Sequence, residues 1–371
     1  MKVKRTAGKV RKIRTTAAAL AALGALASGG AHAQSSVTLY GIVDTGVEYY
    51  NHASNGGSFV GMPTLTGEVP SRFGLRGNED LGNGYKAFFV LENGFAMNSG
   101  ALNYGGRLFG RQANLGISSP YGALTLGRQM NMSMYVLLNA DVIGPSIHSM
   151  ASFDSYLPNA RSDNAAGYLG KFGGLTVGGT YSTGRDAAGP AGPSATNCGG
   201  NVAGDPVACR QYTMMLAYDA AQYGVAASYD VMRGGTGASA PLSNPAYTDT
   251  RTIVDGYVKF GQAKVGGGWI RRNTAAATHS QSDIYFLGAT YYATPALSFD
   301  AQALRYILRS TSDSNLFVGR VNYQLTKRTL IYSSIGYVTN SSRGTAAVAA
   351  GGSVATGSDQ LGVMAGIQQR F

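Results

Sequence analysis

The side chains most often used in catalysis are few and widely separated in this chain of 371 residues. Beyond residue 33, histidine occurs three times, in separate loop-like segments, as His52, His148 and His279. The chain contains no Gly-x-Ser-x-Gly nucleophile turn and no His-Glu-x-x-His metal motif. A hydrolase needs a nucleophile and a base that converge at one place. The sequence therefore predicts no catalytic residues, no metal site and no cofactor.

Residues 1–33 have the features of a cleaved export signal. Seven basic residues and no acid precede an apolar run at 15–28, which is shorter than the roughly 20 residues of a membrane-spanning helix. Ala31-His32-Ala33 offers a small-x-small cleavage site, so we expect the mature chain to begin at Gln34. That chain would carry 23 basic and 19 acidic residues, a net charge of +4 instead of +11. Because it also lacks any Lys/Arg-rich run, nucleic acid is not an expected partner.

The two cysteines, Cys198 and Cys209, both lie in a stretch rich in Gly and Pro. An even count in an exported chain favours a disulfide. A metal site is poorly supported because two sulfurs do not complete a tetrahedral shell and no histidine lies nearby. We predict a disulfide that staples an exposed loop.

Charged and apolar side chains alternate in several segments of the chain. Arg72 and Arg76 lie opposite Phe73 and Leu75 if residues 71–78 are extended, since strand side chains alternate with period two. Residues 37–50 show the same pattern, with one apolar face and one polar face. Two such faces imply two different surroundings. Alternation alone does not separate a barrel in lipid from a soluble sandwich, but Tyr and Phe at strand ends favour a membrane interface.

The last eleven residues, 361–371, form another amphipathic strand that ends on Phe371. A terminal strand of this kind is characteristic of outer-membrane barrels, which must pair their last strand with their first to leave no open edge in lipid. We therefore predict that 361–371 pairs antiparallel with 37–50.

Short and long connections alternate between the predicted strands. Short turns such as 119–122 and 173–174 contrast with longer Gly-, Asn-, Ser- and Pro-rich stretches at about 51–68, 98–106, 131–160, 184–210, 233–250, 274–281, 308–314 and 340–358. An up-and-down barrel with tight periplasmic turns and long external loops has this pattern. Counting the strands gives an all-β, 16-stranded antiparallel transmembrane barrel over residues 34–371, wide enough for an aqueous channel.

Several motifs resemble those of the Gram-negative general porins, especially the β-proteobacterial ones. They are Ser35–Asp44, Ser71–Gly77 with Glu79–Gly82, Tyr85–Glu92, Gly106–Ala113 and Leu124–Gln129. The resemblance spans the mature chain. It implies a homotrimer in the bacterial outer membrane, with a water-filled pore in each barrel for small hydrophilic solutes and ions. It also implies a third external loop folded into the channel, and a role for Phe371 as a mark for the insertion machinery.

That third loop corresponds to 131–160, whose many apolar residues need a wall to pack against. An external flap or a subunit contact is the alternative. Charges at the narrow part would set ion preference, because they act over a Debye length of about 8 Å. Arg72 and Arg76 have inward parity, whereas Arg111 and Arg161 are assigned to the same basic cluster by the resemblance. Asp141 and Asp154 would supply an opposing negative wall.

The period-two alternation does not decide which face of the strand carries Arg111, since it shares a face with Leu115 and Ile117. The same holds for Arg128, which shares a face with Leu124 and Leu126. Either arginine could face a subunit interface or the rim instead. The hypothesis is a mildly anion-selective channel. The alternatives are an outer-membrane barrel enzyme of lipase or protease type and a secreted β-sandwich adhesin.

Overall fold

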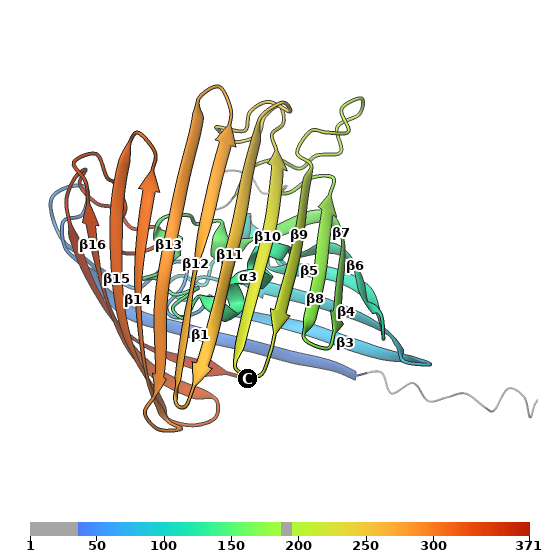
Figure 1. The fold of residues 1–371 in the computed structure, drawn as a ribbon, viewed down its shortest axis with the longest axis horizontal. Coiled ribbons are helices and arrows are strands. Elements are labelled where there is room, and N and C mark those ends of the chain that lie inside the picture. Colours follow the sequence, from blue (N-terminus) through green and yellow to red (C-terminus); the bar gives the residue numbers. More distant parts are fainter. Residues whose placement is uncertain (1–35, 187–194) are drawn as a thin grey trace, which may run out of the picture.

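Sixteen long antiparallel strands close into one barrel (Figure 1). The computed structural model describes residues 36–186 and 195–371, so the expected signal at 1–33 lies outside the described residues. The long strands are β1 (Ser36–Tyr50), β3 (Arg72–Gly82), β4 (Tyr85–Gly94), β5 (Gln112–Ser119), β6 (Gly122–Met130), β7 (Arg161–Phe172), β8 (Leu175–Ser182), β9 (Gln211–Asp219), β10 (Tyr223–Arg233), β11 (Thr248–Phe260), β12 (Ala263–Ala275), β13 (His279–Tyr292), β14 (Leu297–Leu308), β15 (Ser312–Gln324), β16 (Thr329–Asn340) and β17 (Gln360–Arg370). The predicted fold class and strand number are confirmed. None of the helices in the described ranges has the length and apolarity to cross a membrane.

The barrel closes between its first and last strands, as predicted. β1 pairs antiparallel with β17, from Ile42 opposite Arg370 to Tyr50 opposite Gly362. Its other partner is β3, which pairs with residues 36–42, and the short strand β2 (Phe59–Gly61) pairs with residues 48–50. Phe371 adds two backbone hydrogen bonds with Gly41, each 3.1 Å long.

The two faces of each strand have opposite characters, as the alternation indicates. On β1, Val37 and Leu39 are 66% and 59% exposed on the outer face, whereas Asp44 and Glu48 are buried on the inner face. An outer surface covered by exposed Leu, Val, Tyr and Phe suits lipid and would be unfavourable in water. The polar face therefore lines the lumen.

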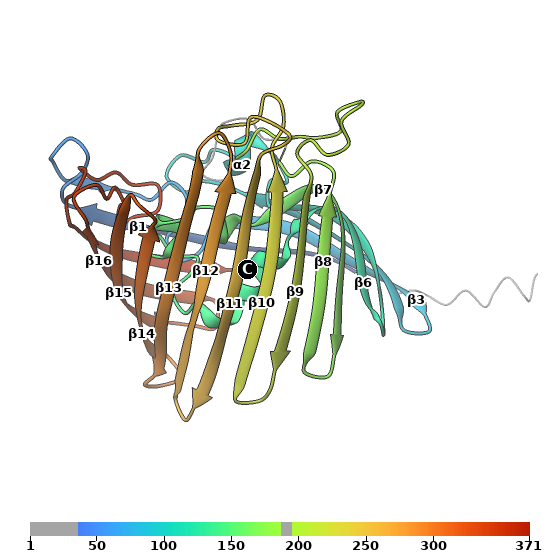
Figure 2. The ribbon, with the colours of Figure 1, turned by 45° about the horizontal axis from the view of Figure 1, so that its top comes forward.

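The two ends of the barrel differ, because the turns at one end are two to four residues long and most loops at the other are much longer (Figure 2). Two of the long loops we expected, 274–281 and 308–314, are absent. There the strands continue and leave three-residue turns at 276–278 and 309–311. The reason is that Ala275 pairs with His279 and Leu308 with Ser312, so polar residues that look like loop in the sequence extend the β-ladder.

The third loop lies inside the barrel. It contains a helix, α3 (Met132–Ala140), and two 3₁₀ turns, η1 (Met150–Ser152) and η2 (Leu157–Asn159). Met, Leu and Ala favour a helix in α3, and the helix ends before Gly144-Pro145. Figure 1 shows α3 behind β10 and β11, within the ring of strands. A shorter helical turn, α2 (Asn103–Gly106), lies in the second external loop.

Deleting Phe371 should lower the yield of folded barrel severalfold while leaving the conductance of correctly closed barrels unchanged. The deletion removes the two hydrogen bonds that end the closing seam and a ring that lies over Gly41 on the outer face. The fraction of compact protein on an unheated gel measures assembly. Phe371→Tyr is the matched control, because it keeps both the backbone bonds and the ring. Normal assembly of the deletion variant would contradict the expectation.

Candidate pore constriction

The third loop is packed against the inner wall by apolar side chains. In α3, Met132, Val136 and Ala140 are 2%, 2% and 0% exposed, and the helix lies against β9, β10 and β11. Ile143 and Ile147, further along the loop, are equally buried in the same cluster. This packing explains why so apolar a segment is not an external flap.

Glycines on the wall make room for this loop. A Cβ on Gly266 of β12 would lie 2.2 Å from the Ala140 carbonyl oxygen, and one on Gly288 of β13 would lie 2.5 Å from Val142. Gly178 of β8 has the same relation to the Met132 sulfur, at 2.5 Å. The approach to the Ala140 carbonyl is to backbone, so Gly266 cannot be replaced without moving the loop, whereas at Gly288 and Gly178 a side chain of the loop would have to shift.

Polar contacts hold the loop along its length. Ser133 donates to Asp230 (3.1 Å), and both guanidinium ends of Arg320 donate to the carbonyls of Val142 and Ile143 (2.9 and 3.1 Å). The third loop is therefore fixed to the wall through both backbone and side-chain atoms.

On another part of the wall, strands β3–β7 and the second loop bring a basic cluster together. Arg111 donates to Glu92 at 2.7 Å and to the Tyr104 hydroxyl at 2.7 Å. Arg72 lies 3.7 Å from the other oxygen of Glu92. Arg161 lies over the Tyr104 ring, with its guanidinium carbon 5.4 Å from the ring centroid. The structure thus places Arg72, Arg111 and Arg161 around one acid and one tyrosine.

Arg161 differs from its neighbours in having no acid partner. It is 1% exposed, and none of its three guanidinium nitrogens finds a hydrogen-bond partner among the described residues. Its positive charge is therefore less compensated than that of Arg111, which shares Glu92.

Arg76 lies two inner-face positions beyond Arg72 on β3, away from this cluster. It is exposed, and its guanidinium carbon stacks 5.2 Å from the centroid of the Tyr40 ring. No salt bridge to Arg76 occurs in the described residues, so it adds a second cation without a paired acid.

Local irregularities in the strands turn Arg111 and Arg128 inward against their parity. The backbone N–H of Arg111 bonds the carbonyl of Glu92, the residue that Gln112 already faces, so two residues oppose one as in a β-bulge. The register between β6 and β7 shifts between Gly127 and Gln129, and Arg128 there pairs with Asp163. Both guanidinium groups are therefore buried against inner groups, Arg111 at Glu92 and Arg128 at Asp163, and neither lies on the lipid-facing surface.

Both acids of the third loop that were predicted from the sequence have bonding partners. Asp154 pairs with Arg251 at 2.8 Å; burial would raise the pKa of Asp154, but the charges of Arg251 and Arg272 outweigh burial and hold it below its usual range. Asp141 accepts hydrogen bonds from Gln302 and from the backbone of Gly144. Burial nevertheless raises the pKa of Asp141.

A second inward segment was missed by the sequence reasoning. Residues 62–71, between β2 and β3, turn into the lumen, where Asp44 accepts from the backbone N–H groups of Glu68 and Val69 (3.1 and 3.2 Å). The Ile147 N–H then donates to the carbonyl of Gly67, which joins this segment to the third loop. The sequence did contain a signal for this segment: an inward-facing acid, Asp44, followed by a Gly- and Pro-containing stretch at 62–71.

Residues from five loops line a partly open cavity of about 250 Å³ beside the basic cluster. Leu65 comes from the segment 62–71, Tyr104 and Arg107 from the second loop, and Pro145 and Pro158 from the third. Asp186 and Ala195 of the fourth loop and Ala350 of the last loop complete the lining, so a solute entering from the loop side meets a mixed apolar and charged surface.

The structure also joins a serine, a histidine and an acid that the sequence did not connect. His148 lies 3.0 Å from the Ser334 hydroxyl and 3.3 Å from Glu48. All three are buried, at 3% exposure or less, between the third loop and the wall. With no access for a substrate, the contact acts as a tether for the loop. No group of three or more potential metal ligands occurs in the parts of the chain that the structure describes.

Comparison with known proteins assigns the family. A family model described as Gram-negative porin matches residues 16–343. The outer membrane porin protein 32 of Delftia acidovorans is 31% identical over 367 residues, which cover 93% of this chain and 97% of the relative. The chain belongs to the Gram-negative porin family. It therefore forms a channel in the bacterial outer membrane.

Solved structures share the fold of this porin. An anion-selective porin from Comamonas acidovorans superposes with a TM-score of 0.74 at 24% identity, covering 91% of this chain and all of the other. The trimer form of OmpT from Vibrio cholerae gives a TM-score of 0.63 at 15% identity, covering 91% and 99% of the two chains. At these identities the likeness shows a common barrel architecture.

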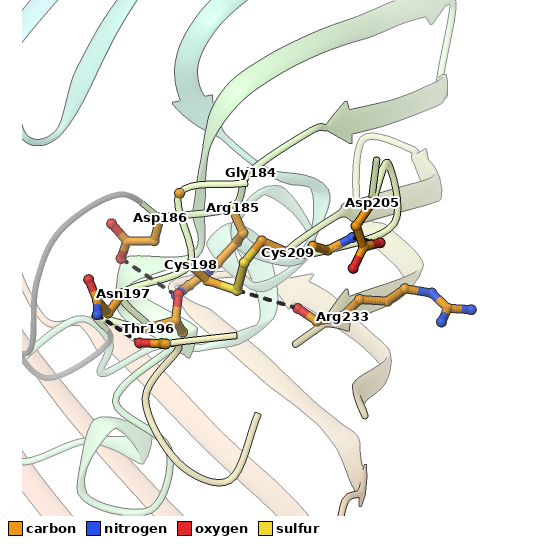
Figure 3. Close-up of a disulfide and its surroundings, with 12 residues drawn as sticks. Gly184, Arg185, Asp186, Thr196, Asn197, Cys198, Asp205, Cys209 and Arg233 are labelled. Atoms are coloured by element: carbon orange, nitrogen blue, oxygen red, sulfur yellow. Dashed lines mark hydrogen bonds and ion pairs between the residues drawn. A yellow bond between two sulfur atoms is a disulfide. The ribbon is translucent and has the colours of Figure 1, made fainter. Parts of the chain in front are cut away.

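The predicted disulfide of the porin is present. Cys198 and Cys209 are bonded, with a Cα–Cα distance of 5.2 Å (Figure 3). The Arg185 N–H donates to the carbonyl of Cys209 within the same connection, and the Cys209 N–H donates to that of Gly234, so the bridged loop is joined to the neighbouring β10–β11 connection. It staples the fourth external loop, as expected.

Replacing both cysteines by serine should destabilise the porin by about 2–3 kcal/mol, because the bridge closes a loop of 11 residues and limits the unfolded chain. Thermal unfolding in detergent measures this effect. Single-channel conductance should stay unchanged, since neither sulfur reaches the basic cluster. Reduced wild-type protein is the control and should behave like the double variant. A large conductance change in both would show that the loop shapes the pore.

Proposed function

We propose that this porin is a homotrimeric general diffusion channel for small hydrophilic solutes, with a mild preference for anions. The observation that carries the anion preference is the charge imbalance at the narrow region. Arg72, Arg111 and Arg161 surround a single carboxylate, Glu92, and Arg161 has no acid partner there. Unit charges in a constriction are incompletely screened over about 8 Å, so an excess of cations attracts anions.

The opposing wall is less charged than its composition suggests. Asp154 is neutralised by Arg251, and that arginine also pairs with Asp249. Asp141 keeps its carboxylate bonded within the loop and to Gln302. We infer that these acids weaken but do not balance the basic side. The field across the pore then favours dipolar solutes over apolar ones.

The remaining parts of the proposal have different support. The trimer form of the Vibrio cholerae protein shows that a related barrel assembles in threes. The Comamonas acidovorans protein of the same fold is named as anion-selective. We also propose that residues 1–33 are removed on export, that Phe371 marks the chain for barrel insertion, and that the porin has no catalytic role.

Reversal potentials in a salt gradient across a planar bilayer test the selectivity. The purified porin should give a potential of the sign expected for greater anion permeability, and the magnitude should fall as salt rises, because screening weakens the field. A clear cation preference would overturn the proposal. Unheated gels test the trimer separately, as a band of three times the monomer mass that disappears on heating.

A further inference from the structure

An arginine patch lies on the outer surface of the barrel, near the loop end of β12, β13 and β14. It consists of Arg271, Arg305 and Arg309, whose side chains are 35%, 52% and 50% exposed. Neither the channel nor its closure uses these residues.

The strand register places the patch on the lipid-facing side. Arg271 is opposite Asp283, and two residues along the same face Trp269 is opposite Tyr285. Beyond them on that face come Leu287 and Phe317, which are 63% and 51% exposed. Arg305 is opposite Tyr285 in the aromatic row, and Arg271 and Arg309 follow it toward the loop end. The outer surface therefore passes from apolar, through a row that mixes aromatic and basic side chains, to basic, which is the order of the hydrocarbon core, the interface and the headgroups.

No long loop starts above the patch, since β12–β13 and β14–β15 are joined by the three-residue turns 276–278 and 309–311. These hairpins stand high at the loop end in Figure 1. The arginines are thus open to the level of the outer-leaflet headgroups.

Two acids hold the three arginines in place but leave some of their hydrogen-bond donors unpaired. Asp283, 2% exposed, accepts from Arg271 at 2.8 Å and from Arg309 at 3.0 Å, while Asp313 pairs with Arg305 at 2.9 Å. The Trp269 indole N–H also donates to Asp283, and the Arg271 guanidinium stacks 4.9 Å from the Trp269 ring. Three cations face two anions, and both Nη groups of Arg271 have no partner within the described residues. Planar guanidinium groups with free donors bind phosphate well.

We propose that this patch binds the phosphate groups of the phosphorylated glycolipid in the outer leaflet. The location selects that source of phosphate, because the patch is at the loop end and faces lipid. Trp269 and Tyr285 would lie against the sugar and upper acyl region, while the arginines hold the phosphate.

The test measures binding of bisphosphorylated lipid A to the intact, detergent-purified porin by native mass spectrometry. The triple variant Arg271→Gln, Arg305→Gln, Arg309→Gln should bind it roughly fivefold more weakly for each arginine removed. The control triple Lys171→Gln, Lys327→Gln, Arg328→Gln removes three exposed charges beside the short turns and should bind like wild type. Lipid A lacking phosphates should not distinguish any of the three proteins.

A second variant guards against misfolding of the triple. Asp313→Asn breaks a half-exposed ion pair and frees Arg305, so it should bind lipid A more tightly than wild type. Equal loss in both triples, or no loss in the arginine triple, would overturn the proposal. Dissociation of the oligomer in the arginine triple, with unchanged lipid binding, would show a subunit interface instead and would also overturn it. Reversal potentials should be unaffected in all variants, so this test is independent of the anion preference.

Discussion

Arg161→Gln is expected to lower the anion-to-cation permeability ratio of this porin about two- to fivefold. Arg161 is 1% exposed, so its charge acts from within the wall on ions that pass beside it, and a unit charge at short range is worth roughly 1 kcal/mol. Arg161 is the right position because it has no acid partner in the described structure, so its removal breaks no salt bridge. Replacing Arg111 would instead leave Glu92 without its 2.7 Å partner and mix two effects.

The measurement is the reversal potential in a tenfold salt gradient, with conductance recorded on the same channels. Arg305→Gln removes an equal charge from the outer surface and is the matched control, expected to leave selectivity unchanged. The unfolding temperature should change little in Arg161→Gln, since no hydrogen bond is lost and the removal of a buried charge offsets the lost contact with the Tyr104 ring. An unaltered permeability ratio would place the selectivity elsewhere, with Arg76 as the next residue to examine.

Val136→Asn is expected to release the third loop and to raise single-channel conductance, with frequent transitions between levels. Val136 is 2% exposed at the contact of α3 with the wall, and an amide buried there without a partner costs roughly 1–3 kcal/mol. The loop is packed closely against glycines of the wall and has little freedom to adjust, so this free-energy cost weakens the contact between the third loop and the wall. A detached loop would no longer narrow the lumen.

Leu138→Asn is the matched control on the same helix. Leu138 is 55% exposed, so the same substitution removes little packing and should leave conductance steady. Larger neutral sugars should permeate the Val136 variant faster in a liposome-swelling experiment and should be excluded by the control. If both variants conduct like wild type, the polar contacts of Ser133, Arg320 and His148 alone suffice to hold the loop.

Sequence reasoning succeeded where the signal is local and periodic. The alternation in 37–50 and 361–371 predicted both strands and their pairing, and the even cysteine count predicted the Cys198–Cys209 bridge. It was wrong at 274–281 and 308–314, because polar residues in a hairpin above the membrane resemble loop residues. The period-two rule also failed at Arg111 and Arg128, since one extra residue in a strand reverses every side chain beyond it.

The sequence by itself determined that this chain is a transmembrane barrel, since two-faced strands, short and long connections and an aromatic closing strand are all written in neighbouring residues. Only the tertiary structure decided how the pore is narrowed. The glycines of β12 and β13, the inward segment 62–71 and the contact of His148 with Glu48 join residues far apart in the chain. The physical reason is that barrel closure brings opposite walls within reach of one loop, and no local pattern encodes which side chains then meet.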